Sequence, residues 1–112
     1  MEKQFWITLF TDEGDNTLKS ITDTFLSQEI NIQQMSAKES LIPSLMQYDI
    51  LVNLNPSAIK ALQKGLSKLN TVHKALSYEP KEKSSSNTRE KIKVALKAVV
   101  RKKQMIPMLS AS

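Results

Sequence analysis

The sequence predicts an α+β domain, in which a four-stranded antiparallel sheet carries two helices on one face, followed by a separate basic helix. Three observations predict this arrangement. Strand-like and helix-like patterns alternate in the order β-α-β-β-α-β between residues 5 and 78. A polar stretch with three consecutive serines then interrupts the pattern. Beyond it, apolar side chains recur at helical spacing among lysines and arginines.

The first strand and helix are marked by a change of periodicity. Residues 5–11 are β-branched and aromatic, and the polar residues 12–16 follow them, which indicates a buried strand and a loop. We expect Asp15 or Asn16 to cap the helix through a side-chain oxygen. The buried stripe of this helix is then expected to comprise Leu18, Ile21, Phe25 and Leu26.

A hairpin follows the first helix. Residues 30–36 alternate as a second strand, with an irregularity expected at Met35. The segment 39–44 contains a proline and reads as the connection, and residues 48–54 form the third strand. The side chains expected to point inward from this strand are Tyr48, Ile50, Val52 and Leu54.

The second helix begins at a strong signal, because Asn55 can cap it and Pro56 needs no hydrogen-bond acceptor in a first turn. Its apolar stripe comprises Ile59, Leu62, Leu66 and Leu69. Residues 71–78 then form a fourth strand. Two split βαβ units with right-handed crossovers give a sheet with both helices on one face. The other face, or an exposed edge, is then free to pair with another copy or another protein.

The expected boundaries are a domain at residues 1–78, a flexible linker at residues 79–88, and a basic amphipathic helix and tail at residues 89–112. Thr88 can cap this last helix, and Pro107 is expected to end it. Its apolar stripe comprises Ile92, Leu96, Val99 and Val100.

Charge divides at the same boundary. Residues 1–78 carry seven lysines against eight acids, a net charge of −1, whereas residues 79–112 carry nine basic residues against three glutamates, a net charge of +6. Attraction to an acidic partner is therefore expected from the tail. Docking onto a protein is the preferred interpretation, and the chain's own sheet, an anionic membrane and nucleic-acid phosphates are the alternatives. The candidate partner-binding residues are Lys93, Lys97, Arg101, Lys102 and Lys103.

Several function classes find no support in the sequence. It has no cysteine, one histidine (His73) and two glycines, so thiolate metal sites, histidine clusters and glycine-rich phosphate loops are excluded. We find no catalytic constellation and expect no enzyme activity, metal or cofactor. His73 lacks a carboxylate at a recognisable spacing, which favours a structural role. No apolar run is long enough to span a bilayer, and we expect a soluble intracellular protein of the cytoplasm or an organelle matrix.

Two short passages resemble a known family. The helix-to-strand passage reads Phe25-Leu26-Ser27-Gln28-Glu29-Ile30-Asn31-Ile32, and the last strand reads Thr71-Val72-His73-Lys74-Ala75-Leu76. Both are similar to the ACT domain, a ferredoxin-like βαββαβ regulatory module, in the version of the aromatic amino-acid hydroxylases and prephenate dehydratases. The resemblance covers residues 5–78. The family has a glycine at the end of the first loop, where this chain has Asn16. The family's Glu-Ser-Arg-Pro stretch corresponds to Ser36-Ala37-Lys38-Glu39, which keeps only the positively charged residue.

The resemblance implies a function without catalysis. It implies a regulatory or adaptor module, ACT-like in fold, that associates with itself or with other proteins through its sheet edge or open face. It also implies a site for a small ligand such as an amino acid, with the candidate residues Asn16, Leu18, Ile32 and Lys38. The alternative is an accessory subunit of a large ribonucleoprotein, respiratory or ciliary assembly, which uses the fold as a scaffold and the basic tail as an anchor.

Overall fold

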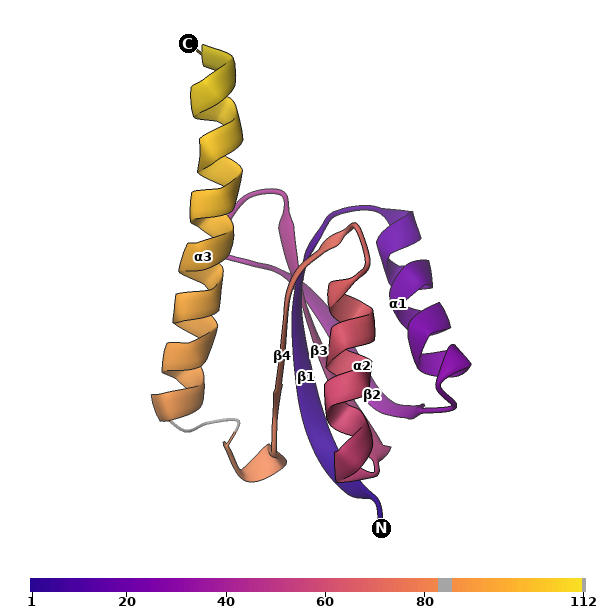
Figure 1. Ribbon diagram of the computed structural model, residues 1–112. Helices are drawn as coiled ribbons and strands as arrows, with labels where there is room; N and C mark the ends of the chain where they lie inside the picture. The colour runs from indigo at the N-terminus through magenta and orange to yellow at the C-terminus, as the bar shows by residue number, and fades with distance from the viewer. Residues whose placement is uncertain (83–85, 112) are drawn as a thin grey trace.

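The computed structural model describes residues 1–82 and 86–111; the side chains of Asp15, Asn87 and residues 100–111 lie outside the described part. The elements follow the predicted β-α-β-β-α-β order (Figure 1). Their bounds are β1 (Lys3–Asp12), α1 (Asp15–Ser27), β2 (Asn31–Glu39), β3 (Leu45–Leu54), α2 (Ile59–Ser67) and β4 (Val72–Tyr78). A 3-10 helix, η1 (Pro56–Ala58), precedes α2, and a second, η2 (Pro80–Glu82), lies between β4 and α3 (Ser86–Ala111).

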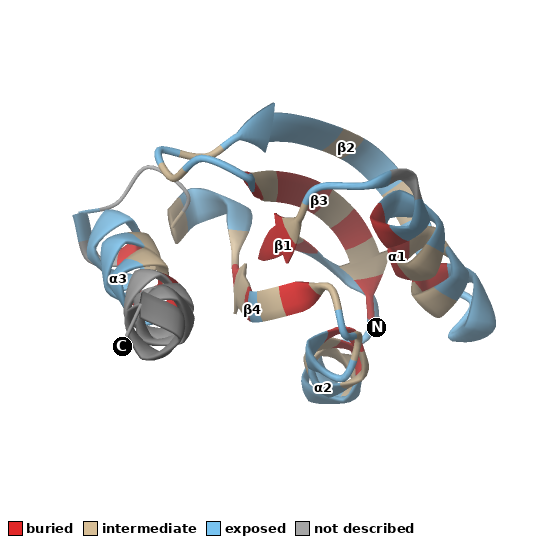
Figure 2. Ribbon diagram, turned by 90° about the horizontal axis from the view of Figure 1, so that it is seen from above, coloured by how far each residue is buried: buried red, intermediate tan, exposed pale blue. Residues whose placement is uncertain are grey.

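The four strands form one antiparallel sheet in the order β2-β3-β1-β4. Both β1 and β2 are antiparallel to β3, so they run in the same direction and β2 is an edge strand. Helices α1 and α2 cover one face, and α3 lies on the other side of the sheet (Figures 1 and 2). The predicted ferredoxin-like βαββαβ sandwich is confirmed.

The main core lies between the sheet and the two covering helices. Phe5, Ile7 and Leu9 of β1 point to this side because alternate residues of a strand share a face. The predicted inward side chains of β3 stand beside them in register and are all buried: Tyr48, Ile50, Val52 and Leu54. Helices supply Ile21, Phe25, Leu62 and Leu66. Burial of each such side chain contributes about 1.5–3 kcal/mol.

The start of α1 differs from the prediction. Gly14 is the capping residue, with φ at 141°, and no side chain caps the helix. Only glycine adopts this backbone angle without strain, so the helix begins one residue earlier than a side-chain cap would place it. Asp15 and Asn16 therefore lie inside the first turn, and the predicted cap is wrong.

The buried stripe of α1 is also displaced. Ile21 and Phe25 are fully buried as predicted, but 43% of Leu18 and 72% of Leu26 is exposed. Thr17 takes the inward position instead, since its hydroxyl donates to the Asp12 carbonyl at 3.3 Å. With Thr17 facing inward, Leu18 and Leu26 face outward.

The remaining caps and irregularities follow the sequence more closely. Asn55 accepts a hydrogen bond from the Ser57 amide at 3.1 Å, as its predicted capping role requires. The irregularity expected at Met35 is present but lies earlier, between Ile32 and Gln34. The extra residue lets Ile32 and Met35 both pack against the main core.

Helix α3 begins earlier and ends later than predicted. It starts at Ser86 and passes Pro107 to reach Ala111, so Thr88 lies within the helix, where it is buried, and does not cap it. The segment 79–88 accordingly contains regular structure at both ends. Ala95 and Val99 pack against Phe10 and Leu45 on the second face of the sheet. The second face of the sheet is therefore not entirely free to pair with another molecule, because α3 covers part of it.

Candidate functional site

The edge strand β2 carries protection against edge-to-edge association only at its two ends. All nine of its residues are exposed or half-buried. Residues 30–37 contain no charged side chain and no proline, and the charges come only at Lys38 and Glu39. Charged residues, prolines and bulges are the usual means of preventing edge-to-edge association. The irregularity after Ile32 disrupts the beginning of β2, which leaves the run from Gln34 onward in regular register.

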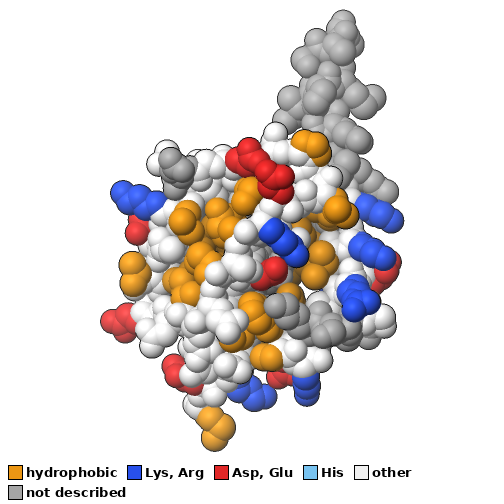
Figure 3. Space-filling view, turned by 180° about the vertical axis from the view of Figure 1, so that it is seen from behind, with side chains coloured by type: hydrophobic (Ala, Val, Ile, Leu, Met, Phe, Trp, Pro, Cys, Tyr) orange, Lys and Arg blue, Asp and Glu red, His pale blue; other side chains and the backbone are white. Residues whose placement is uncertain are grey.

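Hydrophobic side chains flank this strand. Ile32 and Met35 are half-buried against the main core, and the outward-facing Leu18 and Leu26 lie on α1. Leu41, in the β2–β3 hairpin, is 93% exposed. Seen from behind the view of Figure 1, hydrophobic side chains form several groups over the surface (Figure 3). A polar strand between apolar neighbours is typical of a surface that becomes covered by another polypeptide.

A buried polar network lies on the second face of the sheet. The Thr8 hydroxyl donates to Asp49 Oδ1 at 2.8 Å and is also 2.8 Å from the Tyr78 hydroxyl. A carboxylate only accepts, so the single Thr8 proton points to Asp49 and the Tyr78 hydroxyl must donate to Thr8. Gln47 Nε2 donates to both Asp49 oxygens, at 3.3 and 3.2 Å. Asp49 is 8% exposed, so these bonds satisfy a carboxylate largely shielded from water.

The network affects the ionisation of Tyr78. Burial raises the pKa of the Tyr78 phenol above its ordinary value of 10.0; the hydrogen bond with Thr8 lowers it in part, and the negative charge of Asp49 raises it again, so that the net direction is upward. The neutral phenol, which donates the hydrogen bond to Thr8, is thereby stabilised. Sequence analysis did not identify the Thr8 contacts, because they join residues that are 41 and 70 positions apart and appear only when β1 lies between β3 and β4.

His73 has a carboxylate partner that sequence spacing did not reveal. Its Nε2 lies 2.6 Å from Asp12 Oδ1. The pair forms because β1 and β4 change register between Phe10 and Thr11, which places the end of β1 beside the start of β4. The pair joins strand ends next to the β1–α1 loop. The structural role of His73 was predicted from the absence of a carboxylate at a recognisable spacing, and it stays a prediction.

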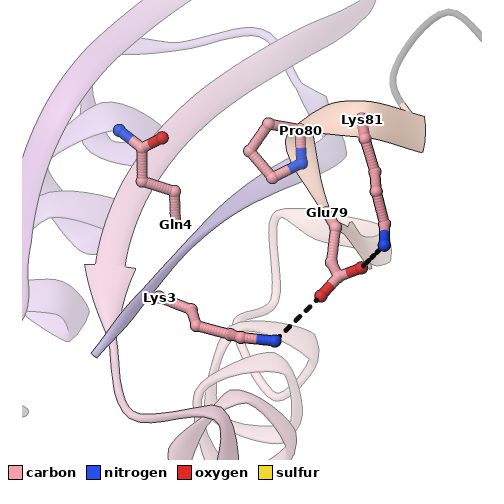
Figure 4. A pocket seen from close by; sticks show the side chains of 5 residues that line it. All are labelled: Lys3, Gln4, Glu79, Pro80 and Lys81. Atoms are coloured by element: carbon pink, nitrogen blue, oxygen red, sulfur yellow. Dashed lines mark hydrogen bonds and ion pairs between the residues drawn. The ribbon is translucent and has the colours of Figure 1, made fainter. Parts of the chain in front are cut away.

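A second ion-pair cluster connects β4, η2 and the N-terminus. Glu79 lies 3.5 Å from Lys3 Nζ and 3.4 Å from Lys81 Nζ (Figure 4). The positive charges of Lys81 and Lys3 lower the pKa of the Glu79 carboxyl. These residues line a shallow cavity with Gln4 and Pro80. The side chains pair with one another there, in a cluster that joins the start of β1 to η2 at the surface.

The four predicted ligand-binding residues do not form one cavity within a single chain. Asn16 and Leu18 lie in the first turn of α1, whereas Ile32 follows the last turn of the same helix. With a rise of 1.5 Å per residue, the two ends of α1 are roughly 18 Å apart. Lys38 stands on the second face opposite Gln47, where it lines a cavity that none of the other three residues lines.

The predicted partner-binding residues are only partly described. Lys93 and Lys97 are exposed on α3, whose apolar side packs on the chain's own sheet. The side chains of Arg101, Lys102 and Lys103 lie outside the described residues. Within the described part of the chain, no group of three or more potential metal ligands is found, and no helix is long and apolar enough to cross a bilayer.

No family model and no curated protein matches the sequence. Solved structures do match the fold. The acetolactate synthase small subunit from Thermotoga maritima superposes with a TM-score of 0.65 at 20% identity, over 70% of this chain and 48% of that one. The ACT domain from the GTP pyrophosphokinase of Chlorobium tepidum gives 0.60 at 13% identity, over 70% of this chain and all of that domain. The C-terminal domain of the MgtC protein from Mycobacterium tuberculosis gives 0.61 at 10% identity, over 75% and 94%.

The chain has an ACT-like fold. The match to the acetolactate synthase subunit spans about half of that protein, whereas the ACT domain of the pyrophosphokinase is matched in full. The narrower resemblance to aromatic amino-acid hydroxylases and prephenate dehydratases stays a prediction. At these identities the likeness establishes the fold, and the function has to be inferred from the surface of this chain.

Proposed function

We propose that this chain is a non-catalytic regulatory or adaptor module that pairs with a second copy of itself through β2. The observation that carries the proposal is the uncharged, proline-free run on an edge strand whose residues are all exposed or half-buried. Backbone groups on the outer side of β2 have no neighbouring strand among the described residues. A second β2 supplies matching donors and acceptors, and covers the adjoining apolar side chains.

The other edge of the sheet is less suited to this role. Strand β4 carries His73 and Lys74, and its register against β1 is irregular near these residues. Helix α3 also packs beside it through Leu76. These features oppose extension of the sheet at β4 and leave β2 as the edge available for pairing.

Antiparallel pairing would also complete the predicted ligand site. Strand β2 starts where α1 ends and ends where α1 begins. A two-fold axis that lies between the two β2 strands, level with the middle of β2, therefore brings Ile32 of the second copy toward Asn16 and Leu18 of the first. The residues separated within one chain become neighbours across the dimer. We propose a small ligand such as an amino acid at this junction, while Lys38 stays on the opposite face.

The pairing is tested by the substitution Ala37→Lys. Ala37 is exposed in the regular part of β2, so a lysine there fits the monomer but places a charge against the paired strand of the second copy. Size-exclusion chromatography with light scattering should show a dimer for the wild type and a monomer for the variant. The control is Ala61→Lys, at an exposed position of α2, which should remain dimeric. A monomeric wild type, or equal behaviour of both variants, would contradict the proposal.

The ligand is tested by equilibrium dialysis with aromatic and branched-chain amino acids. Binding that saturates in the wild type and is lost in monomeric Ala37→Lys supports a site shared by two copies. Binding of equal strength by the monomeric variant would show that the site lies elsewhere. Protein that aggregates alone and dissolves only with partner proteins would instead support the predicted accessory-subunit role.

A further inference from the structure

A separate cavity lies on the second face of the sheet, between the β2–β3 hairpin and α3. Its volume is about 310 Å³, at the lower end of the range for small-molecule sites. The end of β2, the hairpin, β3 and α3 all contribute to its lining. None of Asn16, Leu18 and Ile32 lines it, so it is distinct from the dimer-junction site proposed above.

Much of the lining is aliphatic. Ile92 and Leu96 of α3 are half-buried and pack with the Phe10 and Leu45 cluster. Leu41 lines the same cavity from the hairpin but is 93% exposed. The exposed side chain of Leu41 gains no stabilisation from burial until an apolar group covers it. An apolar ligand in the cavity would provide this cover, so the position of Leu41 favours such a ligand.

The charged groups of the cavity favour an anion. Lys38 and Lys93 line it together with Glu39, which gives one net positive charge. Within the described part of the chain, no ion pair involves either lysine, in contrast to Lys3 and Lys81, which Glu79 neutralises. The aliphatic stems of lysines add to the apolar wall while their ammonium groups stay in water. Glu39 disfavours ligands with several negative charges.

We propose that this cavity binds an aliphatic carboxylate, with its hydrocarbon body against Leu41, Ile92 and Leu96 and its single negative charge beside Lys38 and Lys93. The small volume and the presence of Glu39 both disfavour nucleotides and polyphosphates. The ligand would bridge α3 and the hairpin, which are joined here within one chain. A molecule that binds only this docked arrangement stabilises α3 on the sheet.

Sodium octanoate is a suitable probe. Titrated into the full chain labelled with ¹⁵N, it should produce saturable amide shifts at Leu41, Gln47, Ile92 and Leu96 in two-dimensional NMR spectra. Hydrogen exchange of the α3 amides should slow in its presence. Octanamide, which has the same chain without the charge, should bind more weakly.

Two pairs of variants separate binding from folding. Leu41→Ser removes apolar area and should weaken binding about tenfold. The matched control is Leu26→Ser, at another exposed leucine on α1, which should bind octanoate as the wild type does. Lys93→Gln should weaken binding about threefold, as expected for an exposed ion pair. Its control, Lys64→Gln on α2, should have no effect.

The proposal fails if octanoate produces no saturable shifts, or if Leu41→Ser and Lys93→Gln bind it unchanged. It also fails if the shifts centre on Leu76, Val94 and Ala98, which line a different cavity on the other side of α3. Shifts centred on Leu18 and Ile32 would assign octanoate to the dimer junction and contradict this site. The outcome does not depend on dimerisation, since Ala37→Lys should bind octanoate as the wild type does.

Discussion

At the scale of single residues, the polar groups of the second sheet face have a fixed order of donors and acceptors. Tyr78 donates to Thr8, Thr8 donates to Asp49, and Gln47 donates to Asp49. Each bond contributes about 1 kcal/mol to stability, whereas loss of one partner leaves a buried polar group unsatisfied. Tyr78 belongs to β4, the last strand of the domain, so the network fixes this strand against β1 and β3.

The raised pKa of Tyr78 predicts how stability depends on pH. The folded state holds the phenol proton more tightly than the unfolded state, in which the pKa is near 10. The resulting stabilisation is complete below the unfolded value and is lost as the pH rises through the folded value. Tyr78→Phe removes this contribution and one hydrogen bond. We expect it to lower the free energy of unfolding by about 1 kcal/mol at neutral pH.

Urea denaturation between pH 7 and 11 checks this expectation, with the pH range set around the ordinary tyrosine pKa. The difference in unfolding free energy between the wild type and Tyr78→Phe should shrink above pH 10. Other titrating groups are common to both proteins and cancel in the difference. A difference that stays constant with pH would show that the Tyr78 proton is not held by the fold.

At the scale of secondary-structure elements, α3 is held by one side of its surface. Ala95 is 4% exposed and packs against Phe10 and Leu45, whereas Ala98, less than one turn away, is exposed. The same substitution at these two positions therefore tests the docking. Ala95→Glu places a charge in the apolar contact and should cost about 1–3 kcal/mol, while Ala98→Glu should be nearly neutral.

Hydrogen exchange measures this effect element by element. In Ala95→Glu the α3 amides should lose protection, and the central strands β1 and β3 should keep theirs because they belong to the main core. Retained protection of α3 in Ala95→Glu would mean that the helix is held by contacts other than those of Ala95 and Val99.

Sequence periodicity predicted the elements well and their ends less well. The inward side chains of β3 and the Asn55 cap follow from local pattern, because alternation and capping are properties of short segments. The exposure of Leu18 and Leu26 depends instead on Thr17 and Gly14, whose roles appear only with the β1–α1 loop in place. The position of α3 depends on Phe10, which faces away from the main core and requires a partner on the second face.

The candidate sites likewise combine features that are visible in the local sequence with features that depend on the fold. The absence of charge along β2 is visible in the sequence, but its meaning depends on β2 being an edge strand. The Asp12–His73 pair and the Thr8–Asp49–Tyr78 network join residues far apart in the chain, and no spacing rule identifies them. The cavity beside Leu41 required the docked position of α3, which the sequence left open among four surfaces.

At the scale of the whole molecule, folding and association depend on different parts of the sheet. Helices α1 and α2 bury the main core, and β2 leaves an edge for association on the side away from β4. Helix α3 covers the apolar part of the second face and carries exposed lysines on its outer side. The free energy of unfolding should therefore depend on the packing of α3 against the second face, whereas dimerisation should not depend on α3.

A chain truncated after Glu82 separates the contribution of α3 to stability from the contribution of β2 to dimerisation. It lacks α3, so Phe10 and Leu45 lose their cover, and the free energy of unfolding should fall by about 2–4 kcal/mol because their apolar surface returns to water. Since β2 is unchanged, sedimentation equilibrium should still show a dimer that Ala37→Lys dissociates. A truncated chain as stable as the full one would mean that α3 does not dock on the sheet in solution. A truncated chain that is monomeric, despite an intact β2, would place the dimer contact in α3 and remove the basis for pairing at the sheet edge.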